Sequence, residues 1–175
     1  MIELGVRVRW VFFWGHAAPA VGAIGAHVLS QWSPVEFTVD GVTYRSAERF
    51  MMAGKARLFG AADAERAAIT AAHPAGAKKA ARPVRDFDEA TWVGHRLDVV
   101  VRANVAKFGQ HDDLCSYLLG TGDRVLVEAS PRDRSWGIGM GARDEHAEDP
   151  SCWRGENLRG FPLMAARAQL RQGRG

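Results

Sequence analysis

Hydrophobic residues recur every three or four positions through residues 89–109, which is the spacing of one face of an α-helix. The side chains on this face are Leu97, Val100, Val101, Asn104, Val105 and Phe108. The pattern therefore predicts one long helix over residues 89–109, with this stripe buried against the rest of the chain.

Other segments carry helix and strand signals of their own. Capping residues, glycines and prolines delimit predicted helices over residues 46–60, 61–72, 74–79, 111–120 and 158–170. Alternating apolar residues predict strands over residues 6–13 and 124–129. The dipeptide Asp40-Gly41 between two alternating arms predicts a hairpin over residues 36–44. Together these elements predict a single α+β domain over residues 1–175, a small β-sheet surrounded by several helices.

The N-terminal part also has the length of a membrane span, because no Asp, Glu, Lys or Arg occurs from residue 10 to residue 35. Glycines and prolines interrupt this stretch, however, and the strand at its start alternates. Arg7 and Arg9 of that strand would face solvent. Val6, Val8 and Trp10 would face inward. We therefore expect a strand followed by a loop, and no membrane segment.

Composition changes this picture little. The chain has 175 residues, of which 47% are hydrophobic and 25% charged, and its formal net charge is +3. This charge does not require a nucleic-acid partner. The two cysteines, Cys115 and Cys152, are too few for a disulfide framework, and reduced thiols indicate a cytoplasmic protein.

The helix predicted over residues 46–60 carries two opposite charges on a face with apolar neighbours. Glu48 and Lys55 are seven residues apart, so they project from one face about 10 Å apart along the axis. The lysine side chain leans toward the helix N-terminus, and therefore toward the glutamate. Two unrelated surface charges would show the same spacing, so the pair alone does not define a site.

A glycine-rich loop follows the strand at residues 124–129. It contains Asp133, Trp136, Gly137, Gly139 and Gly141, and glycines allow a backbone to approach a ligand closely. A flexible hairpin loop has the same composition, and the spacing differs from a dinucleotide-binding fingerprint. The acidic run at residues 144–149 lacks the spacing of metal ligands. We expect neither a metal nor another cofactor.

Six segments, in their order and spacing, resemble the NADAR or YbiA-like family from about residue 12 to about residue 170. They read FFWGH, LSQW, FTVDGVTYRSAERFMMAGKA, KFGQH, LLGTGDRVLVEASPRDRSWGIG and GENLRGFPLM. The most specific parts are the S-x-E-x-x-x-x-x-x-K helix, the E-x-x-x-x-D-x-x-W-G loop and the final N-x-x-G. The chain departs from the family at Arg49-Phe50, and at Ala81, where relatives tend to have glycine.

The resemblance implies an N-glycosidase that cleaves the bond between ribose C1 and an amino nitrogen of a guanine-like heterocycle. The expected substrate is a small phosphorylated ribosylamino-pyrimidine of riboflavin synthesis. ADP-ribose attached to guanine in DNA or RNA is the alternative substrate. A non-catalytic module that binds ADP-ribose or a nucleotide is an alternative of another class. The modest net charge favours the small metabolite, because a duplex-binding surface requires more basic residues.

The catalytic residues that the resemblance implies are Glu48, Lys55 and Asp133. Lys55 would attack C1 of a ring-opened ribosylamine to form a Schiff base, while Glu48 transfers protons. A nearby carboxylate would keep Lys55 protonated, whereas the apolar Met51 and Met52 would favour the neutral amine. In the alternative, direct displacement, Glu48 activates water or stabilises an oxocarbenium ion beside Asp133.

The substrate-binding residues that the resemblance implies are Trp92, Trp136, Gly137, Gly139, Asn157 and Arg82. The tryptophans would stack on the base or the ribose, and the glycines would let the loop wrap a phosphate. Asn157 would hydrogen-bond the ribose or order that loop. Arg82, together with Arg85, would donate hydrogen bonds to phosphates.

Overall fold

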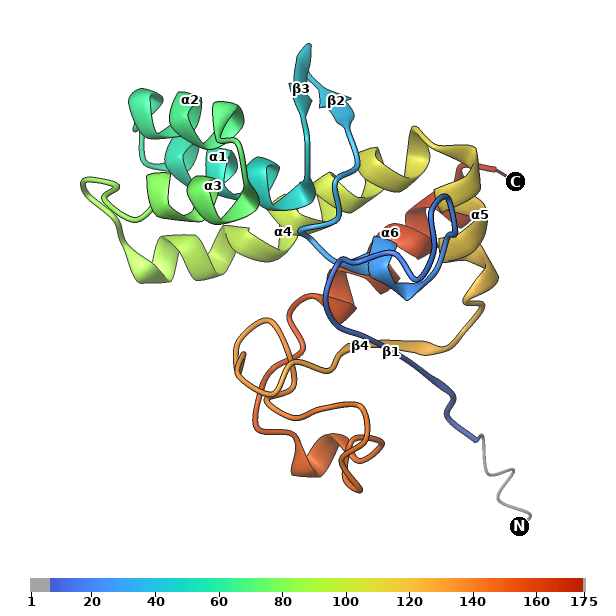
Figure 1. Ribbon diagram of the computed structural model, residues 1–175. Coiled ribbons are helices and arrows are strands. Elements are labelled where there is room, and N and C mark those ends of the chain that lie inside the picture. Colours follow the sequence, from blue (N-terminus) through green and yellow to red (C-terminus); the bar gives the residue numbers. More distant parts are fainter. Residues whose placement is uncertain (1–6, 175) are drawn as a thin grey trace.

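Helix α4, Glu89–Gly109, runs through the middle of the computed structural model, which describes residues 7–174 (Figure 1). Asp88 caps its N-terminus, because the carboxylate accepts a hydrogen bond from the backbone N–H of Thr91 at 2.7 Å. The helix predicted over residues 89–109 is therefore confirmed.

The buried side of α4 differs in part from the predicted stripe. Val100, Asn104 and Phe108 are buried as predicted, but Leu97 is 40% exposed. The buried side includes Lys107, which is fully enclosed. The predicted stripe is therefore wrong at Leu97, and its two remaining valines are only half-buried. It also omits Lys107, because a pattern of apolar residues does not reveal a buried lysine.

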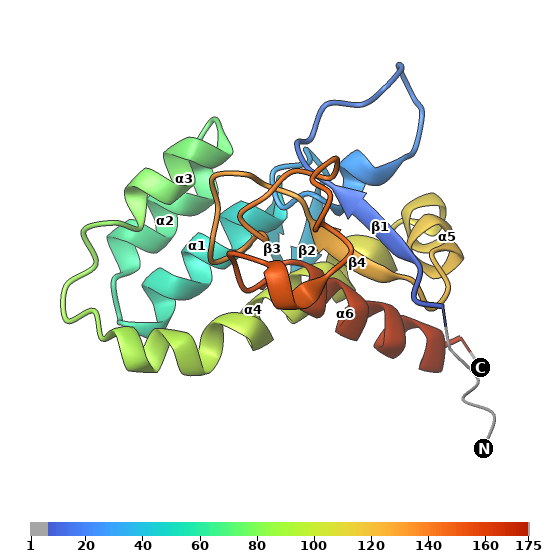
Figure 2. The same ribbon diagram turned by 90° about the horizontal axis from the view of Figure 1, so that it is seen from below.

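The other helices pack on α4 either directly or through α1 (Figures 1 and 2). They are α1 Ala47–Leu58, α2 Ala62–Thr70, α3 Pro74–Ala80, α5 Asp112–Gly120 and α6 Gly160–Gln172. Helices α1, α5 and α6 contact α4, and α2 and α3 pack on α1 and on each other. All five were predicted, and their observed ends lie within two residues of the predicted ends.

The strands form two separate two-stranded sheets rather than one. Strands β1, Trp10–Phe13, and β4, Val125–Glu128, pair in parallel. Strands β2, Phe37–Val39, and β3, Val42–Tyr44, form the predicted antiparallel hairpin. The φ angles of 50° and 78° at Asp40 and Gly41 are those of a tight turn between twisted strands. The α+β fold class is confirmed.

The N-terminal strand is shorter than predicted. It begins at Trp10, opposite Val125, because β4 offers no partner before that residue. Val8 is 50% exposed rather than inward, and Val6 lies outside the described residues. The uncharged stretch continues as an exposed loop and the short 3-10 helix η1, Ala26–Leu29. Within residues 7–174, no helix has both the length and the hydropathy needed to cross a bilayer.

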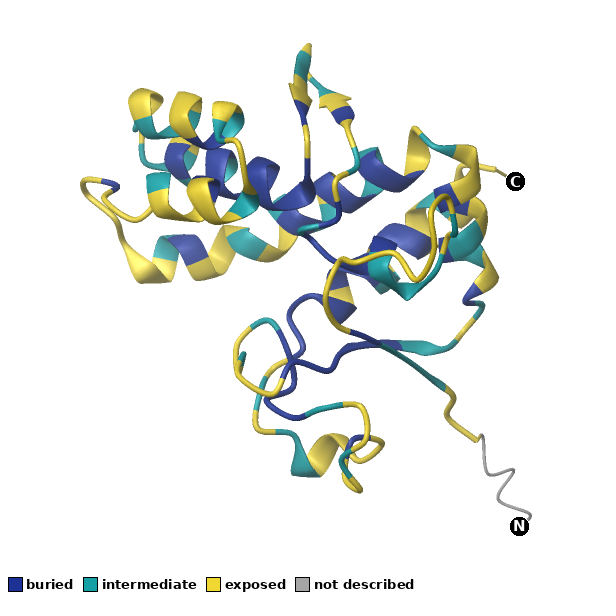
Figure 3. Cartoon of the chain, in the orientation of Figure 1, coloured by how far each residue is buried: buried dark blue, intermediate teal, exposed yellow. Residues whose placement is uncertain are grey.

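Two of the three hydrophobic cores in the described residues lie along α4, which is buried at intervals along its length (Figure 3). The first joins the hairpin, α1 and the N-terminal part of α4, and includes Tyr44, Phe50 and Val100. The second joins β1, η1, α5, β4 and α6 around Phe108. Because α1 belongs to one core while β4 and α6 belong to the other, residues from these elements can meet only where the cores adjoin.

The segment between β4 and α6 is irregular but closely tied to β4. Asn157 is fully buried, and its side chain donates to the carbonyl of Leu126 and accepts from the N–H of Glu128, both at 3.0 Å. The N–H of Ile138 donates to the carbonyl of Glu128 at 3.0 Å. A Cβ atom at Gly160 would overlap the Leu126 carbonyl, so glycine is required there. These contacts fix the loop beside the end of the strand.

Replacing Asn157 by alanine is expected to lower the free energy of unfolding by about 2–4 kcal/mol, because two buried backbone groups of β4 lose their partners. Asn104→Ala is the matched control. Asn104 is also buried, but its side chain donates only to the carbonyl of Val100 in its own helix. We expect Asn104→Ala to lower the free energy of unfolding by about 1 kcal/mol. Urea denaturation compares the two, and equal losses would contradict the role of Asn157.

Candidate active site

Arg159 lies between two buried carboxylates that come from different parts of the fold. Glu48 is in the first turn of α1, Glu128 ends β4, and Arg159 directly precedes α6. The guanidinium Nη1 of Arg159 is 3.0 Å from Glu128 Oε1, and its Nη2 is 3.7 Å from Glu48 Oε2. One cation is therefore shared by two carboxylates.

Burial raises the pKa of Glu48 above its ordinary value, and the positive charges of Arg159 and Lys78 offset this only in part. Burial also raises the pKa of Glu128, again against the opposing effect of Arg159. The nearby carboxylate of Asp133 raises the pKa of both glutamates. The pair is therefore suited to retain a proton.

The glutamates and Arg159 also keep unused hydrogen-bonding capacity. Oε2 of Glu48, Oε2 of Glu128 and Nε of Arg159 are buried, and none has a hydrogen-bond partner among residues 7–174. Buried polar atoms without partners are costly, and they concentrate where a ligand or a reaction supplies the partner. These orphaned atoms favour a functional role for the cluster.

A cavity of about 340 Å³ opens beside this cluster. Glu128 and Arg159 form part of its wall, and Asp133 and Lys78 add a further carboxylate and an amine. The remaining wall is partly aromatic and includes Trp32. Glu48 lies behind the wall, at ion-pair distance from Arg159. The cavity thus combines acidic, basic and aromatic side chains.

Buried contacts hold the first turn of α1 and the segment before it in place. The hydroxyl of Ser46 accepts from the N–H of Arg49 at 3.3 Å, and the N–H of Glu48 donates to the carbonyl of Gln31 at 3.0 Å. From α4, Lys107 donates through Nζ to the carbonyls of residues 28 and 30, at 2.5 and 2.9 Å. Burial lowers the pKa of Lys107 to about 7. This lysine supports the wall without facing the cavity.

Asp133 and Trp136 share one tight turn. Asp133 Oδ1 accepts hydrogen bonds from the N–H groups of Ser135 and Trp136, at 3.0 and 2.8 Å. The Trp136 ring lies 5.8 Å from the Arg159 guanidinium and 5.9 Å from that of Arg96. The structure therefore brings Asp133 and Trp136 to the Glu48 cluster.

Lys55 has a different environment from Glu48, although both belong to α1. Its Nζ lies 4.4 Å from the centre of the Phe87 ring and 5.9 Å from that of Trp92. Burial lowers the pKa of Lys55, and the charge of Glu89 opposes this effect. Lys55 is not part of the cavity wall beside Glu128, and Trp92 is buried in the first core.

The other residues predicted to bind substrate lie in two places. A Cβ at Gly137 would contact the Glu128 carbonyl, so Gly137 lets the loop pack on the end of β4. Gly139 has a φ of 69° and packs against two arginines within the loop. The side chain of Asn157 is occupied by the backbone of β4. Arg82 and Arg85 are exposed on the turn between α3 and α4, outside the cavity.

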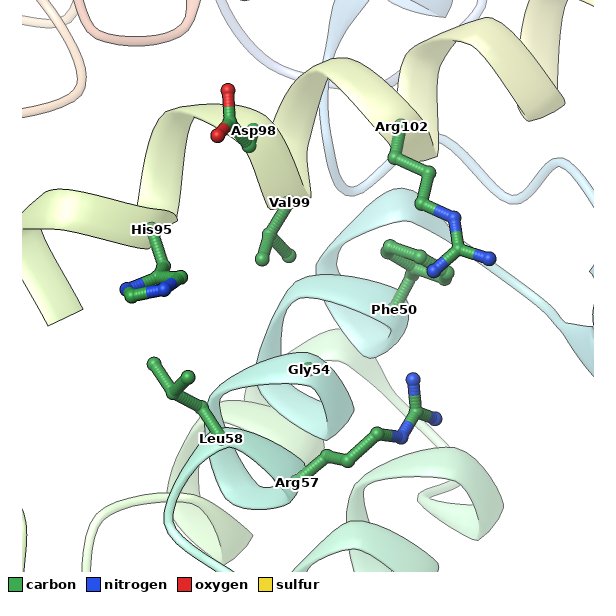
Figure 4. A pocket seen from close by; sticks show the side chains of 8 residues that line it. All are labelled: Phe50, Gly54, Arg57, Leu58, His95, Asp98, Val99 and Arg102. Atoms are coloured by element: carbon green, nitrogen blue, oxygen red, sulfur yellow. The ribbon is translucent and has the colours of Figure 1, made fainter. Parts of the chain in front are cut away.

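A larger hollow of about 410 Å³ between α1 and α4 lacks comparable chemistry (Figure 4). Its floor is apolar, its two arginines are paired with carboxylates, and its other polar side chains, a histidine and an aspartate, are exposed. Arg57 is paired with Glu65, and Arg102 with Asp40. Chemical content rather than size therefore identifies the cavity beside Arg159 as the candidate site.

Sequence reasoning from single residues missed Glu128, Arg159, Lys78 and Lys107. Three of these four lie within the segments that carry the family resemblance, and Lys78 lies outside them. The family motifs were the signal that could have pointed to these three residues. The pattern of apolar and polar residues does not indicate that an arginine or a lysine is buried. Within the described part of the chain, no group of three His, Cys, Asp or Glu side chains is arranged to hold a metal ion.

Comparisons with known proteins identify the family and the fold. Residues 12–171 match the NADAR domain family. The chain is 39% identical over 169 residues to N-glycosidase R617 of Acanthamoeba polyphaga mimivirus, covering 94% of this chain and 98% of that protein. It is 29% identical over 144 residues to a riboflavin biosynthesis protein of Vibrio vulnificus, covering 82% of this chain and 35% of that protein. The NMR structure of the Escherichia coli protein YbiA superposes with a TM-score of 0.74 at 24% identity, covering 95% of this chain and 87% of that one.

The chain has the α+β fold seen in YbiA, with an acidic and basic site where two of its cores adjoin. It belongs to the NADAR family. It is an enzyme of the N-glycosidase class, as the resemblance of its motifs predicted.

The raised pKa of Glu48 predicts a pH-dependent effect on stability. The folded state binds the Glu48 proton more tightly than the unfolded chain, so this carboxyl destabilises the fold as pH rises from 4.5 through its folded pKa. We expect Glu48→Gln to raise the free energy of unfolding by about 1–2 kcal/mol at pH 7.5. This gain in the free energy of unfolding should disappear toward pH 4, where the Glu48 carboxyl is protonated in both the folded and the unfolded chain.

Urea denaturation of the wild type and of Glu48→Gln across this pH range measures the effect. Glu36→Gln is the control, because Glu36 is exposed and forms only a surface ion pair with Arg45 at 3.7 Å. Glu36→Gln should change the free energy of unfolding by less than about 0.5 kcal/mol at every pH. A Glu48→Gln variant less stable than wild type at pH 7.5 would refute the prediction.

Proposed function

We propose that this enzyme hydrolyses the bond between ribose C1 and the exocyclic amino nitrogen of a guanine-like ribosylamine. The proposed substrate is a ribosylamino-pyrimidine phosphate of riboflavin synthesis. The arrangement of Glu48, Arg159 and Glu128 carries this proposal, because two buried carboxyl groups with raised pKa adjoin a cavity. The similarity to a Vibrio vulnificus protein named for riboflavin biosynthesis supports the substrate class.

The proposed reaction needs a proton donor, because an amine leaves C1 readily only when its nitrogen is protonated. Glu48 and Glu128 share one guanidinium, so they titrate as a coupled pair that keeps a proton to higher pH than an exposed carboxyl group. The electron pair of the C1–N bond moves to the nitrogen, which takes the proton of this pair. The heterocycle leaves as the free amine.

Asp133 is the proposed base for the attacking water. One of its oxygens is held by backbone N–H groups, and Oδ2 makes no hydrogen bond to any described residue. The water oxygen bonds to C1, and its proton passes to Asp133. The products are the free aminopyrimidine and ribose phosphate. A carboxyl donor and a separate carboxylate base are the usual requirement of glycoside hydrolysis by direct displacement.

A Schiff-base route through Lys55 is the competing mechanism. The lowered pKa of Lys55 favours the neutral amine that this route needs. Its position against Phe87 and Trp92, outside the cavity, favours direct displacement instead. Lys78 is an amine that does form part of the cavity wall. The two mechanisms differ in whether a covalent sugar adduct forms on a lysine.

ADP-ribose linked to guanine is the second candidate substrate, because it contains the same type of C1–N bond. One observation favours it: the cavity adjoins a further hollow of about 460 Å³, which adds to the space for a larger substrate. The experiment therefore compares both substrates.

Base release measured by mass spectrometry tests the proposed reaction. The wild type is expected to release base from a ribosylamino-pyrimidine phosphate faster than from an oligonucleotide carrying ADP-ribosyl-guanine. Glu48→Gln and Glu128→Gln should each reduce the rate about 10²–10⁴-fold, because the proton donor is lost. Glu36→Gln is the control and should retain the wild-type rate. Tight binding of both substrates without release would refute the reaction and support a binding module.

Borohydride trapping separates the two mechanisms. Direct displacement predicts no sugar adduct on the wild type during turnover. It also predicts that Lys55→Ala retains base release within about tenfold. A trapped adduct would contradict direct displacement. Comparing adduct formation by Lys55→Ala and Lys78→Ala would then identify the nucleophile, because only replacement of that lysine removes the adduct.

A further inference from the structure

A second hollow adjoins the cavity beside Arg159. Its volume is about 460 Å³, and it shares Lys78 and Asp133 with that cavity. Arg132 and Arg134, the neighbours of Asp133 in the chain, contribute to its wall. Three cationic side chains thus line a hollow that shares part of its wall with the candidate active site.

The wall of this hollow carries more positive than negative side chains, three cations against the carboxylate of Asp133. Lys78, Arg132 and Arg134 form no ion pair and no side-chain hydrogen bond with any residue in the range 7–174. The single carboxylate present, Asp133, has one oxygen engaged by two backbone N–H groups. Several other arginines do have carboxylate partners, including Arg57 with Glu65 at 2.5 Å. The hollow therefore has the charge to attract an anion.

The turn that carries the two arginines is fixed in position. The N–H of Gly139 donates to the carbonyl of Asp133 at 3.0 Å, and that of Glu156 donates to the carbonyl of Arg134 at 3.1 Å. Gly155 packs so closely on the backbone of Arg134 that a Cβ atom would not fit. A turn held in this way presents its side chains with little loss of backbone entropy on binding.

We propose that Lys78, Arg132 and Arg134 form the subsite for the phosphate ester on the ribose of the substrate. This inference rests on the N-glycosidase reaction proposed above and specifies what recognises its phosphorylated substrate. The 5-phosphate lies at the opposite end of the ribose from C1. In the inferred pose, C1 lies in the cavity beside Glu128 and the phosphate enters the adjoining hollow. Guanidinium groups bind phosphate oxygens through paired N–H donors, and the lysine adds a point charge.

This assignment differs from the one that the family resemblance implies. Arg82 and Arg85 lie on the turn between α3 and α4 and contribute to neither the cavity nor the adjoining hollow. Their exposure does not distinguish them, because the three cations of the proposed subsite are exposed as well. Gly137 and Gly139 pack against residues of the loop and the end of β4. The phosphate would thus be held by side-chain cations rather than by a glycine-rich backbone.

Isothermal titration of the full chain with ribose 5-phosphate, ADP-ribose and unphosphorylated ribose tests the subsite. Arg132→Ala/Arg134→Ala should bind a phosphorylated probe about 10–100-fold more weakly than wild type, because charge-assisted hydrogen bonds are lost. Affinity for ribose should not change. The control Arg171→Ala/Arg174→Ala removes the same charge near the other end of α6, about 18 Å along the helix from Arg159, and should bind like wild type.

The two phosphorylated probes distinguish the source of the phosphate. A loss of affinity for ribose 5-phosphate assigns the subsite to a phosphomonoester, and a loss confined to ADP-ribose assigns it to a pyrophosphate. Both results support the inference. Wild-type affinity in Arg132→Ala/Arg134→Ala, an equal loss in the control, or no binding of either phosphorylated probe to wild type would overturn it. A loss produced by Arg82→Ala alone would also overturn it.

The test does not depend on turnover. Binding of a phosphorylated probe that requires Arg132 and Arg134, without base release from any substrate, would refute the proposed reaction and leave the subsite intact. Base release that is insensitive to both arginines would refute the subsite and leave the reaction intact.

Discussion

The pairing of Arg159 with Glu48 and Glu128 is the constraint on which the rest of the structure depends. It joins α1, β4 and the start of α6 through one guanidinium. Burial away from water raises the pKa of both glutamates, the nearby carboxylate of Asp133 adds to this, and the single guanidinium of Arg159 offsets it only in part. The burial that makes an ionised glutamate costly at neutral pH also keeps on this pair the proton that the proposed hydrolysis needs. Stability and function therefore oppose each other at this position.

The surrounding fold positions this cluster through contacts that are individually ordinary. Helix α4 contributes to both of the hydrophobic cores that lie along it, so α1 on one side and α6 on the other are held against it. Lys107 fixes the segment before Trp32, and Asn157 fixes the loop beside β4. Each of these side chains satisfies buried backbone groups that would otherwise lack partners. The site therefore lies where polar side chains hold the two halves of the molecule together through hydrogen bonds.

Local sequence patterns predicted the helices within two residues of their observed ends, and they predicted the hairpin at Asp40-Gly41. Caps, turn residues and apolar periodicity act over a few residues, so they can be read locally. The parallel pairing of β1 with β4 joins segments on either side of most helices and leaves no local signal. The prediction that Val8 faces inward was wrong for this reason, because the strand exists only where its partner does.

By itself, the sequence determined the α+β class, the positions of the helices and, through the motifs of its family, the N-glycosidase class. Only the tertiary structure decided which polar residues share one cavity. It brought Glu128 and Arg159 to Glu48, and it placed Lys55 against Phe87 instead. Helical periodicity depends on neighbours along the chain. Burial, pairing and pKa depend on groups that are distant in sequence and adjacent only after folding.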